Sequence, residues 1–145
     1  MDDLADAWSR LLRVHTALAP TLDGELQRAH GLPVTWYDVL LELSVAPGRR
    51  LTMGELGDRA VVSRTRVSRV VDDLVRARCV VRETNPDDGR SSFAALTPEG
   101  RRRFNAATPT YRAGIRRHFG AHVTEREARA MSKALQRVLD ATGVE

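Results

Sequence analysis

The sequence predicts a mainly α-helical fold in which a helix–turn–helix unit and a β-hairpin lie between long terminal helices. Three observations predict it. Apolar residues repeat at helical spacing near both ends of the chain. Two short helical segments are separated by only two or three residues, and a β-branched segment then runs into a turn rich in Asn, Pro, Asp and Gly. With 145 residues, the chain suits a single domain.

Amphipathic helices are predicted at both ends of the chain. Residues 3–30 form the first, because apolar side chains recur there at steps of three and four, and Gly31 is placed to end it. The last begins after Thr124, which forms a capping-box pattern with Glu127. One side of it carries Ala128, Met131, Leu135, Val138 and Leu139. So small a core cannot cover these faces, so we expect a second copy of the chain to pair with them around a two-fold axis.

Three shorter helices are predicted in the middle of the chain. Each follows a residue type that commonly caps helices: Thr35 for a helix of about three turns, Thr52 for a helix over 53–60, and Ser63 for a helix over 63–78. The last two are close enough in sequence to form a helix-turn-helix.

A two-stranded hairpin follows, with strands at 80–84 and 92–96. Thr97 and Pro98 then start a further helix that runs to Phe119, and Pro109 is expected to kink it. The chain is therefore expected to be one domain over 1–145. Within it a winged helix-turn-helix lobe, residues 35–100, is flanked by dimerisation helices over 3–30 and 101–145.

The composition permits a polyanionic partner without proving one. The net charge is +4 and the pI about 10.2, but all of the 23 basic residues except Lys133 are arginine, and genome composition alone can produce such an excess. No apolar run long enough for a transmembrane helix and no signal-peptide pattern occurs, and there is one cysteine. Together these observations predict a cytoplasmic protein.

The helix predicted over 63–78 has the side chains of a DNA-reading helix. Val67, Val70, Val71 and Leu74 form its inward stripe, so the remaining residues face outward. Arginine pairs with guanine, and Ser and Thr reach bases or phosphates. The candidates for DNA contact on this helix are Ser63, Arg64, Thr65, Arg66, Ser68 and Arg69. The alternative is a basic face that is merely solvated.

The segment DGRSSFAALTPEG resembles the wing of the MarR family (multiple antibiotic resistance regulators), which are bacterial winged-helix transcription factors. That wing reads Asp-x-Arg, a short strand, then Leu-Thr-x-x-Gly, and this chain matches it with Asp88, Arg90, Leu96, Thr97 and Gly100. The segment VSRTRVSRVVDDLVRARCVVRE and the order of elements are also similar. Where the family often has glycine after the recognition helix, this chain has Cys79.

The resemblance implies a homodimeric, sequence-specific DNA-binding regulator, acting as a repressor on a pseudo-palindromic operator. It implies that Arg90 enters the minor groove, where negative potential attracts a guanidinium. Asp88 is then expected to hold an arginine, either Arg90 or one from the recognition helix. Asp87 is expected to serve the turn. Alternatively, both acids only form the turn and Arg90 is solvated.

The resemblance also implies a pocket for a small aromatic or anionic effector between the dimer helices and the DNA-binding lobe. Rings and polar groups suitable for such a pocket are Trp8, Arg13, His15, Trp36, Tyr37 and Asp38. The alternative for each of them is ordinary packing.

Other site chemistries have weaker support in the sequence. The nucleotide-binding, hydrolase and zinc-protease motifs GxxxxGK[ST], GxSxG and HExxH are absent, so we expect no enzyme and no cofactor. His118 and His122 are four residues apart, but no Cys or carboxylate completes a metal set close by. Cys79 is either a redox sensor beside arginine or, more commonly for a free cysteine, a small buried side chain.

Two functions from other classes remain as alternatives. One is a winged-helix module that binds proteins and no longer binds DNA. The other is a small-molecule binding protein without a regulatory role.

Overall fold

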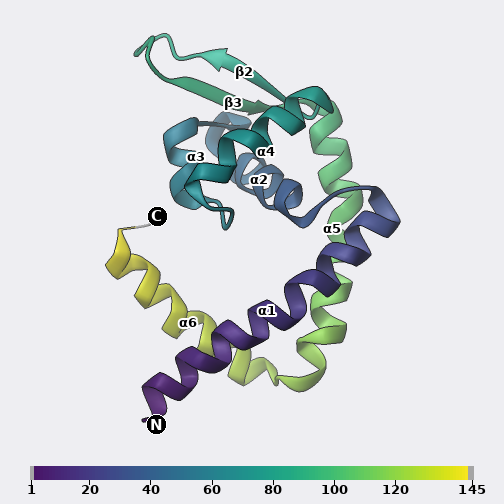
Figure 1. Ribbon diagram of the computed structural model, residues 1–145, viewed down its shortest axis with the longest axis vertical. Helices are drawn as coiled ribbons and strands as arrows, with labels where there is room; N and C mark the ends of the chain where they lie inside the picture. The colour runs from purple at the N-terminus through teal and green to yellow at the C-terminus, as the bar shows by residue number, and fades with distance from the viewer. Residues whose placement is uncertain (1, 144–145) are drawn as a thin grey trace.

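The computed structural model describes residues 2–143 and confirms a mainly helical chain with a small antiparallel sheet (Figure 1). Its elements, in order, are α1 (Asp3–His30), α2 (Val34–Val45), the 3₁₀ helix η1 (Pro47–Arg49), β1 (Arg50–Thr52), α3 (Met53–Arg59), α4 (Arg64–Arg76), β2 (Val80–Thr84), β3 (Ser92–Leu96), α5 (Pro98–His118), the 3₁₀ helix η2 (Gly120–His122) and α6 (Glu125–Thr142). The last two residues of the predicted range 101–145 lie outside the described residues.

Local capping explains where most helices begin and end. Asp2 accepts the N–H of Ala5 at the start of α1, and Gly31, at φ 61°, ends that helix as predicted. Capping boxes built on Thr52 and Thr124 open α3 and α6, and Thr97 accepts the N–H of Gly100 at the start of α5. The predicted helix starts at these positions are therefore confirmed.

The start of α2 differs from the prediction. Thr35 is not its cap: the helix begins at Val34, and Pro33 occupies the cap position without a side-chain bond. The N–H of Val34 instead donates to the Asp23 carboxylate of α1, at 2.8 Å. The cap comes from eleven residues earlier in the chain, so a local sequence pattern does not show it.

The helix expected over 63–78 is shorter. The observed α4 spans Arg64–Arg76, and Ser63 stands at its cap position without a side-chain cap bond. The helix α5 runs through Pro109 over its full range of Pro98–His118.

The sheet has three strands, not the two that were predicted. β3 lies in the middle, with β1 and β2 antiparallel on its two sides. The hairpin strands have the predicted bounds, and Val80 pairs with Leu96. The missed strand is only Arg50–Thr52, and its Leu51 pairs with Ala94. Three residues are too few for a period-two pattern to show.

The core lies inside the lobe formed by α2, α3, α4 and the sheet, with the C-terminal end of α1 and the N-terminal half of α5 packed on it (Figure 1). The terminal helices contribute little to this core. None of the described residues of α6 is buried, and Leu4 at the start of α1 is 84% exposed. The described chain therefore leaves long apolar helix faces uncovered at one end.

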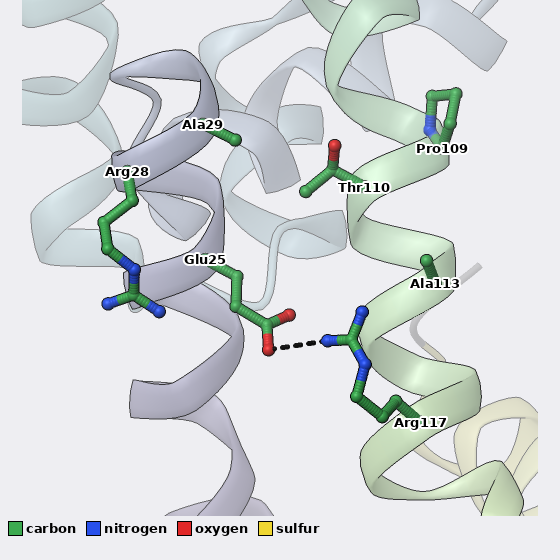
Figure 2. A pocket seen from close by; sticks show the side chains of 7 residues that line it. All are labelled: Glu25, Arg28, Ala29, Pro109, Thr110, Ala113 and Arg117. Atoms are coloured by element: carbon green, nitrogen blue, oxygen red, sulfur yellow. Dashed lines mark hydrogen bonds and ion pairs between the residues drawn. The ribbon is translucent and has the colours of Figure 1, made fainter.

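An ionic cluster holds α1 against α5. The Glu25 carboxylate on α1 accepts hydrogen bonds from Arg117, at 3.0 Å, and from His118, at 2.6 Å (Figure 2 shows the first). The bond with His118, followed by the charge of Arg117, lowers the pKa of Glu25. Glu25 also contributes to an open groove of about 570 Å³ between the two helices, which Figure 2 shows with Arg28 and Thr110 on its wall.

The residue after α4 with a left-handed backbone is Arg78. It has φ 62°, in the region that favours glycine. Cys79 is fully buried beside it. The sequence analysis singled out Cys79, whereas the backbone conformation that favours glycine is at Arg78.

Replacing Arg78 with glycine should stabilise the protein by about 0.5–1 kcal/mol. Glycine removes a left-handed penalty of about 1–2 kcal/mol and loses about 0.5–1 kcal/mol more backbone entropy than other residues on folding. Urea denaturation measures the difference. Arg78→Ala is the control, because it removes the long side chain but keeps the left-handed strain. A glycine variant no more stable than the alanine variant would contradict this explanation.

Candidate nucleic-acid interface

The helix α4 presents a polar face to solvent because its apolar stripe is buried. Val67, Val70, Val71 and Leu74 all lie in the core, as predicted. The sequence candidates on the first two turns, Ser63, Arg64, Thr65, Arg66, Ser68 and Arg69, are all exposed. The fold thus displays three arginines and three hydroxyl side chains on one short length of helix.

Neighbouring elements orient some of these side chains. Arg64 forms an ion pair with Asp58 of α3. Ser63 and Thr65 bring their hydroxyl oxygens to 3.4 Å of each other. Arg66 lines a cleft that reaches back towards α1 and α5. Ser68 and Arg69 are therefore the candidates that point to solvent without a partner among the described residues.

Asp88 bonds the backbone of the hairpin turn. Its carboxylate accepts the N–H of Arg90 at 3.0 Å, and Asn85 accepts the N–H of Asp87 in the same way. The turn role expected of Asp87 thus belongs to Asn85 and Asp88. Residues 2–143 contain no ion pair between Asp88 and an arginine side chain. Asp88 therefore constrains Arg90 through its main chain, and Arg90 itself is exposed at the wing tip.

Asp38 connects α2 to the turn of the helix-turn-helix. Its carboxylate accepts the N–H of Val61 at 2.7 Å and that of Val62 at 3.3 Å. Burial raises the pKa of Asp38, and the two backbone bonds oppose that rise. Burial, with the nearby charge of Asp38, also raises the pKa of Glu42 one turn further along α2. The position of the turn before α4 thus depends on a carboxylate that is partly removed from water.

A cleft of about 620 Å³ lies between the lobe and the long helices α1 and α5. Its wall is mostly apolar, and its polar groups include Asp38, Arg66, His15 and His118. Three of the six predicted effector residues, His15, Tyr37 and Asp38, line it.

The other three predicted effector residues do not line the cleft. Trp8 is 61% exposed near the free end of α1, and Arg13 is exposed on the same helix. Trp36 packs against the core, with the Arg103 guanidinium 6.0 Å from its ring centre. Sequence reasoning missed Arg66, Tyr111, His118 and Phe119, which also line the cleft. The sequence pattern assigns Arg66 to DNA contact and residues 101–145 to dimerisation.

The structure also bears on the redox, metal and membrane alternatives. Cys79 is fully buried, and its sulfur lies 3.7 Å from a guanidinium nitrogen of Arg103. Among residues 2–143, no group of three His, Cys, Asp or Glu side chains could hold a metal ion. No helix in that part of the chain is long and apolar enough to cross a membrane.

Comparison with known proteins places this geometry in a family. The MarR family model matches residues 30–91. Sco3205, a MarR family transcriptional regulator from Streptomyces coelicolor, was solved in complex with DNA. Its chain is 31% identical in sequence to this one, and the two structures align with a TM-score of 0.83 over 93% of this chain and 84% of that chain. The chain belongs to the MarR family. MarR family members are transcriptional regulators that bind DNA, and the winged helix-turn-helix described above is their fold.

Two further regulators extend the comparison. The transcriptional regulator MhqR of Bacillus subtilis (strain 168) is 29% identical over 109 residues, which cover 75% of this chain and 73% of MhqR. An organohalide-sensing regulator, RdhR-CbdbA1625, was solved with 2,4-dichlorophenol bound. It shares the fold at a TM-score of 0.80, over 98% of this chain and 82% of that chain, with 19% identity.

Replacing Asp38 with asparagine should change how stability depends on pH. The folded pKa of Asp38 is raised, so its ionisation favours the unfolded chain. The wild type should therefore lose stability, relative to Asp38→Asn, as pH rises from the ordinary aspartate pKa of about 3.9, and the loss is complete above the raised pKa. The raised pKa of Glu42 is coupled to the same charge, so the substitution relieves both groups.

Thermal unfolding of both proteins across this range measures the effect. Asp38→Ala is the control, because it cannot accept the N–H groups of Val61 and Val62 and should be less stable than Asp38→Asn at every pH. Parallel curves for the wild type and Asp38→Asn would contradict the proposed burial cost.

Proposed function

We propose that the protein is a homodimeric, sequence-specific repressor that a small effector releases from DNA. The observation that carries this proposal is the exposed Arg, Ser and Thr face of α4, set beside a hairpin with Arg90 at its tip. In this arrangement α4 lies in the major groove and the hairpin reaches the adjacent minor groove. Bound over a promoter, such a dimer excludes polymerase.

Reading of bases is assigned to the residues that face solvent near the start of α4. Ser68 and Arg69 are exposed on the second turn, and Arg69 can pair with guanine through two hydrogen bonds. Ser63, Arg64 and Thr65 lie closest to the helix start and suit phosphate contacts, which fix the register of the protein on the duplex. Arg90 supplies the minor-groove contact of the wing, and Asp88 holds its backbone in place.

Dimerisation is assigned to the terminal helices. Met131, Leu135, Val138 and Leu139 are 39–59% exposed along α6, and Leu4 and Trp8 are exposed along α1. Apolar faces of this size on a monomer mark an interaction surface. A second copy related by a two-fold axis is the simplest partner, and it also produces a pseudo-palindromic operator with half-sites about one helical turn apart.

The effector is assigned to the cleft between α1, α5 and the lobe. A ligand there would contact the long helices and would also reach Arg66 of α4 and Asp38, which holds the turn before α4. It can therefore favour a different spacing of the two reading helices. The regulator RdhR-CbdbA1625, which has the same fold, was solved with 2,4-dichlorophenol bound. This supports a small phenolic or anionic ligand for the present protein. Titrating phenols and benzoates into the operator complex tests this, and a Leu18→Trp variant that fills the cleft should resist release.

Binding of the duplex upstream of the protein's own gene should be tight and should weaken steeply with log salt concentration. Arg69→Ala should cost about 1–3 kcal/mol and relax the sequence preference at one base pair. Fluorescence anisotropy against a scrambled duplex measures both. Arg112→Ala removes the same charge from the exposed surface of α5 and should have little effect. Equal losses for the two variants would indicate a non-specific charge effect instead of base reading.

Placing a charge on the apolar face of α6 should separate the dimer. Leu135→Glu should sediment near the 16.1 kDa of one chain, whereas the wild type should sediment near twice that mass. A buried glutamate pair across the two-fold axis is strongly unfavourable. Val45→Glu changes an apolar side chain that is 70% exposed on α2 and should leave the dimer intact. A wild-type protein that sediments as a monomer would contradict the proposed assembly.

A further inference from the structure

One ion pair joins the reading helix to the wing. Asp72 lies on the exposed face of α4, and its carboxylate is 2.6 Å from a guanidinium nitrogen of Arg82 on β2. Both side chains are partly exposed, at 51% and 37%. Among the described residues, no other ion pair links α4 to the hairpin.

Packing holds the inner part of the hairpin. On β3, Ala94 and Ala95 are buried, whereas on β2 only Val80 is buried and the four residues that follow it, 81–84, are exposed. The hairpin turn beyond them is also mostly exposed, and its wing tip carries Arg90. Beyond the pair of Arg82 and Ala94, no residue of the two hairpin strands is buried.

A second group of side-chain contacts spans the three strands. The guanidinium of Arg50 on β1 stacks 4.3 Å from the ring centre of Phe93 on β3 and lies 3.4 Å from the Glu83 carboxylate on β2. This group spans all three strands, so it couples them without touching α4. The pair of Asp72 and Arg82 adds a direct ionic contact between this sheet and α4.

The angle between the sheet and α4 matters most at the wing tip. About four residues separate Arg82 from the turn, which is roughly 13 Å at about 3.3 Å per strand residue. A rotation of the hairpin by about 10° at Arg82 would therefore move the turn by about 2 Å. A displacement of this size removes a guanidinium from hydrogen-bond reach of a base edge. An exposed ion pair adds little to folding stability.

We propose that Asp72 is a positioning residue for minor-groove reading, because its pairing with Arg82 sets the direction in which the wing carries Arg90. This inference rests on the proposed function, in which α4 and the wing read one duplex together. It makes Asp72 a determinant of specificity although its charge opposes DNA. Electrostatics alone predicts the contrary, namely that removing this acid tightens binding to every sequence.

Two sets of duplexes separate these effects. One set carries inosine–cytosine pairs (I·C) and the other guanine–cytosine pairs (G·C). The pairs are placed at the minor-groove positions that the wild type protects in footprinting and that Arg90→Ala leaves accessible. The two base pairs differ only by the amino group of guanine in the minor groove. The ratio of their dissociation constants therefore reports wing contact alone. We expect about tenfold for the wild type, no discrimination for Arg90→Ala, and at most about twofold for Asp72→Asn.

Exchanging the two charges provides the matched variant. The double substitution Asp72→Arg with Arg82→Asp keeps the net charge and can re-form the pair, so it should restore at least half of the wild-type ratio. An Asp72→Asn protein that binds every duplex more tightly and keeps the tenfold ratio would overturn the proposal.

A second measurement does not depend on DNA. Nitroxide labels at Ser68→Cys and Gly89→Cys, in a Cys79→Ala background diluted with unlabelled protein, report the distance from α4 to the wing by pulsed electron resonance. We expect one narrow distribution, broadened or shifted by Asp72→Asn and restored by the charge exchange. An unchanged distribution overturns the positioning role. A wild-type protein that binds no duplex would instead contradict the proposed function. The label distances would still test whether Asp72 positions the wing.

Discussion

The hydrogen bonds from Val61 and Val62 to the Asp38 carboxylate are the contacts on which the DNA-binding lobe depends. They fix the turn of the helix-turn-helix against α2, and the turn fixes where α4 starts. The apolar stripe of α4 then determines its rotation, because Val71 and Leu74 are fully buried. One carboxylate and one buried stripe therefore decide which side chains of α4 face outward. The carboxylate is held at a cost, since burial raises its pKa.

Acidic side chains organise the arginines of this lobe. Asp58 pairs with Arg64, Asp72 with Arg82, and Asp73 with Arg76. Each pair is at or near the surface, where its contribution to stability is small. A long guanidinium side chain that is held in one direction loses less conformational entropy when it binds a partner. In a basic protein these acids thus reduce the overall attraction to a polyanion but orient the side chains that remain available to it.

Sequence reasoning predicted the parts of the fold that depend on local patterns. The capping boxes at Thr52 and Thr124 and the hairpin strands were confirmed because neighbours in the chain determine them. The cap that Asp23 supplies to α2 and the strand β1 were missed because their partners lie far away in sequence. The same limit applies to the cleft. Arg66 and His118 line it only after α4 and α5 have packed, so no spacing along the chain could place them together.

The cleft and the proposed DNA surface share walls, and this has consequences for regulation. Arg66 belongs to α4, His118 belongs to α5, and Asp38 holds the turn between α3 and α4, yet all three line one cavity. His118 also bonds Glu25, which holds α1 against α5. A molecule in that cavity therefore contacts the helices assigned to dimerisation and the elements that orient α4. In the proposed dimer, a change in the packing of the long helices cannot leave the separation of the two reading helices unaltered, so coupling follows from the shared walls and needs no further moving part.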